Sequence, residues 1–330
     1  MSNRNHIKEK RSPTRRGRGC IVWLGGLLAG VLLLIVAGAI YEPIAEARDA
    51  QAHPPPGQMV DVGGYRLHIN CTGTGSPTVV IDAGLGDWST SWSFVQAEVA
   101  KTTRACTYDR AGLGWSEAGP LPRDARQFAR ELNALLHNAN IPGPYVLAGH
   151  SLGGLPVRVF VHDYPAEVAG IVLIDSMHPG QSKRSAADAN TQATTQTHAL
   201  PVLPTLARLG IVRLLGQPLA GAVSVPEDQK AYNSRFVLPQ SVQEWADESR
   251  ALPDSLAQAG AVTTFGDLPL IVLSRGLDLD PAWQAGQAEL FQLSSNSEHL
   301  IAEQSDHNIA FNQPGAAVAA LVKMIEQLRK

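Results

Sequence analysis

Residues 145–154, Tyr-Val-Leu-Ala-Gly-His-Ser-Leu-Gly-Gly, decide the fold of this 330-residue chain. Apolar residues at the start of the stretch predict a buried strand, and residues 155–164 are compatible with a helix. Between the two lies Gly149-x-Ser151-x-Gly153. We expect glycine on both sides of Ser151 because the chain turns so sharply from strand to helix that side chains there would clash. Such a turn exposes the serine hydroxyl at the tip of a sheet.

The same turn predicts a place for negative charge. The amide of Leu152 lies at the start of the following helix, where free N–H groups and the helix dipole favour an anion. A Gly-x-Ser-x-Gly pentapeptide also occurs by chance, but a strand before it and a helix after it favour a nucleophile elbow. The stretch therefore predicts a nucleophilic serine beside an oxyanion donor.

Strands and helices alternate on both sides of this stretch. A hairpin is predicted over 58–62 and 65–70, where two short alternating runs are split by a Gly-Gly pair. Further strands are predicted at 78–82, 103–108, 170–175, 268–274 and 298–303, and helices at 94–101, 124–138, 283–293 and 316–328. This order predicts an α/β fold with a mostly parallel, eight-stranded sheet covered by helices on both faces.

The alternation stops between residues 178 and 267. That stretch has no clear strand, and its second half, 227–258, looks helical in pieces. A segment of about 90 residues is too long for a plain loop, so we predict an inserted, mainly helical cap. The core would then comprise residues 58–177 and 268–330.

The first 57 residues have a different character. Residues 1–19 form a basic tail, and residues 20–40 carry no charge over about 21 positions, which is enough to span a bilayer. The positive-inside rule puts the N-terminus in the cytoplasm and the rest of the chain on the other side of the membrane. Residues 41–57 are expected to be a linker, with Pro54-Pro55-Pro56-Gly57 as a stiff break.

Two interpretations of residues 20–40 stay open. A cleaved signal peptide has a shorter apolar region, although Ala37-Gly38-Ala39 resembles a cleavage site. An uncleaved signal-anchor fits the length better. Either way, most of the chain would face an oxidising compartment, in which cysteines pair.

Composition and motifs exclude several classes of function. The chain has 27 Lys and Arg against 30 Asp and Glu, a formal charge of −3, so no nucleic acid is expected as a partner. It contains no HExxH, paired CxxC or P-loop motif. Neither a metal nor an organic cofactor is therefore expected.

Four motifs together resemble the α/β-hydrolase fold. They are Gly-His-Ser-Leu-Gly-Gly at 149–154, Asp-Ala-Gly-Leu-Gly at 82–86, Tyr-Asp-Arg-Ala-Gly at 108–112, and Ser-Asp-His at 305–307 followed by Asn312-Gln313-Pro314. The likeness covers about residues 58–330 apart from the cap. It is specific for the fold, weak for the substrate, and implies a serine-nucleophile member similar to esterases and lipases.

The resemblance implies roles for individual residues. Ser151 would be the nucleophile and His307, in the loop before the final helix, its general base. The oxyanion donors would be the amides of Leu152 and, from the loop after strand 78–82, Leu85. This loop has Asp-Ala where many relatives carry His-Gly, so the second donor stays open.

Three neighbouring residues are expected to shape the site rather than react. His150 would be a structural or pocket-wall residue. Asp109 and Arg110 would form a salt bridge at the rim.

The acid that orients His307 has two candidate places, and the sequence leaves the choice open. Asp175 ends strand 170–175, which resembles the acid position of some dehalogenases and lipases of this fold. Asp278 and Asp280 follow strand 268–274, the commoner position in the family, but their spacing departs from the usual Gly-x-x-Asp. Of these two, Asp280 is favoured because it precedes a proline.

The resemblance also implies a disulfide. In the usual strand order of the fold, the second strand lies beside the fourth. These are the strands that carry Cys71 and Cys106, and export to an oxidising compartment is compatible with their pairing. Two buried, unpaired cysteines are the alternative.

We therefore expect a membrane-anchored serine hydrolase that cleaves an ester or related acyl bond through a Ser-His-Asp triad and an acyl-enzyme. Its partners would be a small acyl substrate and the membrane, through residues 20–40. Peptidase, haloperoxidase-like and carbon–carbon hydrolase chemistry stay open, because the fold alone does not give the function. A non-catalytic binding module is the alternative of a different class.

Overall fold

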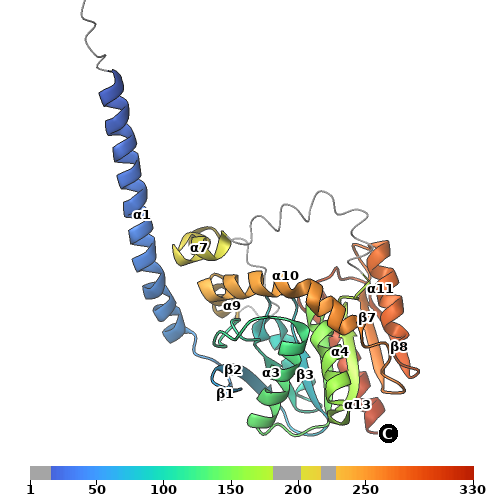
Figure 1. Cartoon of the computed structure of the whole chain (residues 1–330). Coiled ribbons are helices and arrows are strands. Elements are labelled where there is room, and N and C mark those ends of the chain that lie inside the picture. Colours follow the sequence, from blue (N-terminus) through green and yellow to red (C-terminus); the bar gives the residue numbers. More distant parts are fainter. Residues whose placement is uncertain (1–15, 181–201, 217–227) are drawn as a thin grey trace, which may run out of the picture.

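An eight-stranded sheet forms the centre of the computed structural model, which describes residues 16–180, 202–216 and 228–330 (Figure 1). The strand order is β1-β2-β4-β3-β5-β6-β7-β8. Strands β3 to β8 pair in parallel, and β2 runs antiparallel to both of its neighbours. The predicted α/β fold class is thus confirmed.

The strands lie close to where the sequence predicts them. They are β1 Gln58–Asp61, β2 Arg66–Thr72, β3 Thr78–Asp82, β4 Ala105–Tyr108, β5 Tyr145–His150, β6 Val168–Ile174, β7 Leu270–Arg275 and β8 Ser297–Ala302. Every residue of β3, β4 and β5 is buried. These strands have apolar residues on both faces because helices cover both sides of the sheet.

Helices cover each face with a separate apolar cluster. The helices of the predicted core are α2 Ser93–Val99, α3 Ala125–Asn138, α4 Gly154–Asp163, α11 Pro281–Phe291, α12 Ile309–Asn312 and α13 Pro314–Leu328, with 3-10 turns at Ser89–Trp92, Ser151–Gly153 and Pro165–Glu167. The helices α3, α4 and α11 pack on one face, and α2 and α13 pack on the other. The sequence analysis missed the short helix α12, which has only four residues.

In the described parts of the region predicted as a cap, residues 202–216 and 228–267, four helices lie between β6 and β7. They are α7 Leu203–Arg208, α8 Ile211–Gly216, α9 Gln229–Phe236 and α10 Pro239–Gly260. Figure 1 shows α10 lying across the end of the sheet where α4 begins. Two buried ion pairs join α10 to the core, Glu244 with Arg123 and Glu248 with Arg110, each at 2.6 Å. Removing one partner of such a pair typically costs about 3–5 kcal/mol, so these contacts fix α10 on the core.

The N-terminal segment is one helix, α1 Arg16–Ala52. The helix runs through most of the predicted linker 41–57, since it continues to Ala52. Residues 45–52 are rich in alanine, which favours helix, and Glu42 and Asp49 pair with Arg213 of α8. The three consecutive prolines begin after His53, one residue beyond the end of the helix. Most of the basic tail expected at 1–19 lies outside the described residues.

The apolar part of α1 is exposed. The stretch Trp23–Ala52 is long and apolar enough, by length and composition, to cross a membrane. Large side chains between Leu24 and Ile40 face solvent rather than the protein core. A bilayer would remove this apolar surface from water.

The expected disulfide is confirmed. Strands β2 and β4 pair so that Cys71 stands directly opposite Cys106, with 4.1 Å between their Cα atoms. The bond crosses the antiparallel part of the sheet and closes a loop with a sequence separation of 35.

A thiol titration tests this bond in the whole chain, which has three cysteines. We expect one reactive thiol per chain, that of Cys20, after denaturation without reductant, and three after reduction. The variant Cys20→Ser should show none before reduction. Two reactive thiols in that unreduced variant would mean that Cys71 and Cys106 are not bonded.

Candidate active site

A sharp turn between β5 and α4 presents Ser151. Its φ is 52°, in the left-handed region that L-residues rarely adopt. A Cβ atom on Gly149 would lie 2.6 Å from the carbonyl oxygen of Gly153, and a Cβ atom on Gly153 would overlap the carbonyl oxygen of Asp82 on β3. Only glycine fits at either place, as the sequence predicts, and this lets the turn pack directly on the neighbouring strand.

His307 lies between Ser151 and Asp175. The Nε2 atom of His307 is 2.9 Å from the Ser151 hydroxyl, and Nδ1 is 2.6 Å from Oδ2 of Asp175. Because a carboxylate only accepts hydrogen bonds, Nδ1–H donates to Asp175, and the lone pair of Nε2 then faces the serine hydroxyl. Asp175 is fully buried, Ser151 is nearly so, and His307 keeps 30% of its side chain exposed. The structure thus joins three residues far apart in the sequence into one chain of hydrogen bonds.

The second oxygen of Asp175 is also occupied. Oδ1 accepts a hydrogen bond from the indole N–H of Trp283 at 2.8 Å and a longer one, 3.3 Å, from the backbone amide of Arg275. The indole ring stands edge-on to the imidazole of His307, with ring centres 5.0 Å apart. Trp283 therefore contacts both the acid and the imidazole. Sequence reasoning missed it because no motif marks a tryptophan in the first turn of a helix.

The alternative acids lie elsewhere. Asp280 is the N-cap of α11, and its side chain accepts the amide N–H of Ala282 at 2.8 Å. Asp278 is exposed in the same loop and has a φ of 50°. Among the contacts of the described residues, neither carboxylate bonds to His307, whose Nδ1 faces Asp175. The sequence favours Asp280 over Asp278 because a proline follows it. Proline is common at the first position of a helix, and the residue before it is then the N-cap. Asp280 has this capping role.

The backbone near Ser151 offers two sources of N–H donors. Leu152 is buried in the helical turn Ser151–Gly153 that opens α4. The loop after β3 approaches at Gly84, where a Cβ atom would lie 3.4 Å from Cβ of Ser151. Leu85 follows in this loop and is half-buried. Its amide stays the predicted second donor.

A buried arginine holds this loop in place. Arg110 donates to the carbonyl oxygens of Ala83 and Gly84 at 2.8 and 2.5 Å, and it pairs with Asp82 at 2.7 Å. Glu248 of α10 accepts from the same guanidinium and, at 2.8 Å, from the amide of Gly86. Burial raises the pKa of Asp82 to about 6, and the charge of Arg110 opposes this. One guanidinium thus ties the loop beside Ser151 to the cap region.

The salt bridge expected between Asp109 and Arg110 is not formed. Arg110 turns to Asp82 and Glu248, and Asp109 is fully buried against His68, with 2.9 Å between Oδ2 and Nδ1. Asp109 also accepts the backbone amides of Ser89 and Trp115. Consecutive residues at a strand end point in different directions, so neighbouring positions in the sequence do not ensure contact.

His150 is a structural residue next to the imidazole of His307. Its Nε2–H donates to the backbone carbonyl of His307 at 2.9 Å, and the two rings are 4.9 Å apart. Burial, together with the nearby His307, lowers the pKa of His150 to about 4. His150 is therefore neutral at neutral pH. In the part of the chain that the structure describes, no group of three or more His, Cys, Asp or Glu side chains forms a metal site.

Comparisons with known proteins identify the family. A family model described as alpha/beta hydrolase fold matches residues 77–313. The probable transporter efuK of Hormonema carpetanum is 35% identical over 126 residues, which are 36% of this chain and 18% of that protein. YqjL of Bacillus subtilis is 25% identical over 247 residues, 73% of this chain and 81% of that protein. An uncharacterized vacuolar membrane protein of Saccharomyces cerevisiae is 32% identical over 132 residues, 34% of this chain and 20% of its own length.

Solved structures show the same fold. The epoxide hydrolase CorEH has a TM-score of 0.61 at 19% identity, covering 82% of this chain and 99% of its own. A putative lipase from Acinetobacter baumannii has a TM-score of 0.64 at 20% identity, covering 87% and 96%. The chain belongs to the α/β-hydrolase fold family, as its motifs indicated. Membership of this family supports a hydrolase as the general class of enzyme, and it leaves the substrate open.

The low pKa of His150 predicts a pH dependence of stability. The pKa is about 4 in the folded chain against an ordinary 6.5, so between these values only the unfolded state takes up the proton. Stability must then fall as the pH drops from 7 to 5, by about 2 kcal/mol from this residue. In His150→Gln, which stays neutral and keeps an N–H donor, a denaturant titration should lose less stability between these pH values.

The exposed residue His162 provides the control. His162→Gln should keep the pH dependence of the natural chain. If His150→Gln and the natural chain lose stability equally between pH 7 and 5, His150 is not the titrating group.

Proposed function

We propose that the chain is a membrane-anchored serine hydrolase that cleaves an ester or related acyl bond. The observation that carries this proposal is the hydrogen-bonded chain Ser151–His307–Asp175, with the serine at a strained turn. Nucleophile, base and orienting acid in this arrangement are the parts that acyl transfer needs. Asp175, rather than Asp280, is the acid in this proposal.

In this proposal each residue has a role in the reaction. As Oγ of Ser151 attacks the carbonyl carbon, Nε2 of His307 takes the hydroxyl proton, and Asp175 stabilises the imidazolium through Nδ1–H. The amide of Leu152 and one from the loop 83–86 would hold the oxyanion. His307 then gives its proton to the leaving alcohol. Water, deprotonated by the same imidazole, releases the acyl group as a carboxylic acid.

Other chemistries of the fold fit this site less well. In this fold, the chemistry of epoxide hydrolases and dehalogenases resembles a mechanism in which an aspartate is the nucleophile. Here the elbow carries Ser151 instead. A binding module without catalysis has no need for a strained serine bonded to a buried histidine–aspartate pair. Peptidase, haloperoxidase-like and carbon–carbon hydrolase activities share the same three residues, and substrate tests separate them from ester hydrolysis.

Membrane anchoring is the second part of the proposal. The exposed apolar surface of α1 and the length of Trp23–Ala52 support it, as does the likeness to a vacuolar membrane protein of yeast. The basic residues before the span favour a cytoplasmic N-terminus and a catalytic domain on the other side. The disulfide fits an oxidising compartment.

Ester hydrolysis tests the catalytic assignment. With short- and medium-chain p-nitrophenyl esters and the full chain in detergent, Ser151→Ala should abolish turnover, because it removes the nucleophile. Asp175→Asn should lower kcat by roughly 10⁴-fold, because the amide no longer stabilises the imidazolium or fixes its tautomer. Asp280→Asn is the matched control and should leave kcat within about threefold, since asparagine also caps helices well.

If kcat fell in Asp280→Asn but not in Asp175→Asn, the acid would be Asp280 rather than Asp175. A natural chain that neither turns over these esters nor reacts with a serine-directed phosphonate would overturn the catalytic proposal in favour of a binding module.

Trp283 is predicted to position the acid and the imidazole. Trp283→Phe keeps the ring and removes the N–H that Asp175 accepts. A hydrogen bond to a charged group contributes roughly 1.5–3 kcal/mol, so we expect kcat to fall by about tenfold or more with KM nearly unchanged. Trp115→Phe removes an indole N–H that is bonded to the carbonyl of His53 and not to Ser151, His307 or Asp175, and it should retain activity. Equal kcat values for the two variants would remove this role from Trp283.

A further inference from the structure

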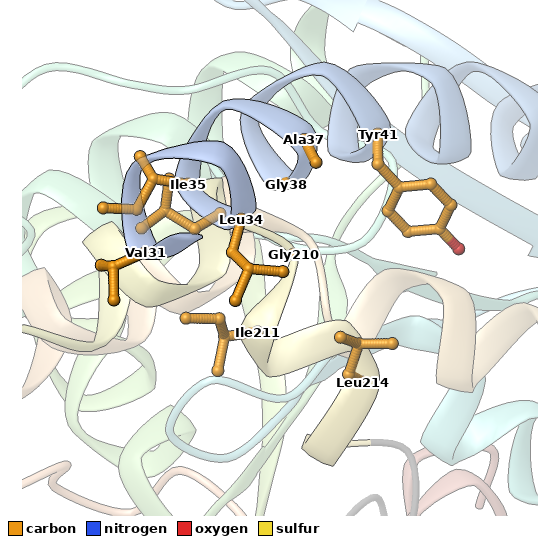
Figure 2. Close-up of a pocket in the computed structure, with 10 residues that line it drawn as sticks. Val31, Leu34, Ile35, Ala37, Gly38, Tyr41, Gly210, Ile211 and Leu214 are labelled. Atoms are coloured by element: carbon orange, nitrogen blue, oxygen red, sulfur yellow. The ribbon is translucent and has the colours of Figure 1, made fainter. Parts of the chain in front are cut away.

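A groove with almost wholly apolar walls lies between α1 and the helix pair α7–α8 (Figure 2). Its volume is about 570 Å³. One wall consists of Val31, Leu34, Ile35, Ala37, Gly38 and Tyr41, and the other of residues 209–211 and Leu214. The two walls approach each other where Gly38 faces the carbonyl oxygen of Leu209, and a side chain on Gly38 would clash there. The cap region thus contacts the apolar part of α1.

The position of this contact along α1 places it at one membrane boundary. Trp23 and Tyr41 are exposed aromatic residues 18 positions apart, which is about 27 Å along a helix. This matches the roughly 30 Å of a hydrocarbon core, and Trp and Tyr favour its two interfaces. The first acidic residue of the helix, Glu42, follows directly. Gly38 and Tyr41, which contact α7–α8, then lie at the interface next to the catalytic domain.

A buried ion cluster fixes α8 to α1 at this level. Arg213 pairs with both oxygens of Glu42, at 2.8 and 2.9 Å, and with Asp49 at 2.5 Å. The end of α1 is held as well, because the carbonyl oxygen of His53 accepts from Trp115 of the core and from Arg235 of α9. Since both ends of this contact are fixed, α8 cannot move away from the level of Tyr41 without breaking buried charge pairs.

The outer side of α8 is apolar and uncovered by the described residues. Leu214 and Leu215 are 73% and 66% exposed, although both are large aliphatic side chains next to the apolar span. We infer that α8 is a second membrane contact. Its leucines enter the leaflet next to the catalytic domain, and the acyl chains of that leaflet's lipids fill the groove. This inference rests on the anchoring proposed above and is independent of the hydrolase activity.

Site-directed fluorescence tests the inference in the full chain reconstituted into phosphatidylcholine vesicles. Single cysteines for an NBD label are introduced in a Cys20→Ser background, with the disulfide left intact. The positions are Leu214, Leu215, Ile211 in the groove, Leu33 on the lipid side of α1, and Ile301 as an exposed apolar control on β8. Lipids that carry a doxyl quencher high or low on the acyl chain report the depth.

We expect labels at 214 and 215 to be quenched several-fold more strongly than the label at 301, and more by the shallow quencher than by the deep one. The label at 33 should favour the deep quencher. If the label at 33 is quenched and the labels at 214 and 215 behave like the label at 301, the proposed membrane contact of α8 is wrong and the anchoring by α1 is retained. If 33 also resembles 301, the anchoring itself is wrong.

The label at 211 tests what fills the groove. Lipid chains would quench it to the same extent at every protein-to-lipid ratio. Quenching that disappears as the protein density rises would mean that a second copy of the chain covers the groove, and it would overturn the lipid assignment. A label at 211 that resembles 301 at all ratios would mean a water-filled groove, with the same consequence.

Discussion

The steric constraint at the elbow governs the whole site. Ser151 can hold a φ of 52° only because Gly149 and Gly153 let β5, α4 and β3 approach closely enough to fix the turn from both sides. The same close approach brings the loop after β3 next to the serine. A hydroxyl held in one direction, with backbone amides close by, is pre-organised for attack on a carbonyl group.

Charged residues that the chain buries away from water connect this site to the rest of the molecule. Arg110 joins the loop beside Ser151 to α10, and Arg213 joins α8 to α1. Because α7 packs on α10 and α8 follows α7, contacts run without a break from the apolar helix to the loop beside Ser151. Ion pairs of this kind add little net stability, but they fix geometry, since a lost partner leaves a buried charge.

Spatial position, rather than position in the sequence, distinguishes the two candidate acids Asp175 and Asp280. Both Asp175 and Asp280 follow parallel strands at the same edge of the sheet, so strand order alone permits either. Asp280 caps a helix, and the helix that it caps carries Trp283, which binds Asp175 instead. The helix after the loop in which the family more often keeps its acid thus supplies a donor that supports an acid on the neighbouring strand.

The resemblance to the family implied the disulfide, and the structure decided it. The sequence by itself determined the sheet, the elbow, Ser151 with His307 as candidates, and the apolar helix. These follow from local signals: apolar periodicity, glycines at a tight turn, charge-free length and the motifs of a family. Tertiary structure alone decided which aspartate faces His307, that Trp283 contacts both, that Arg110 turns away from Asp109, and that Arg213 pairs with Glu42 of α1. Each of these depends on partners 100 or more residues away or on the direction of a side chain, which no local pattern specifies.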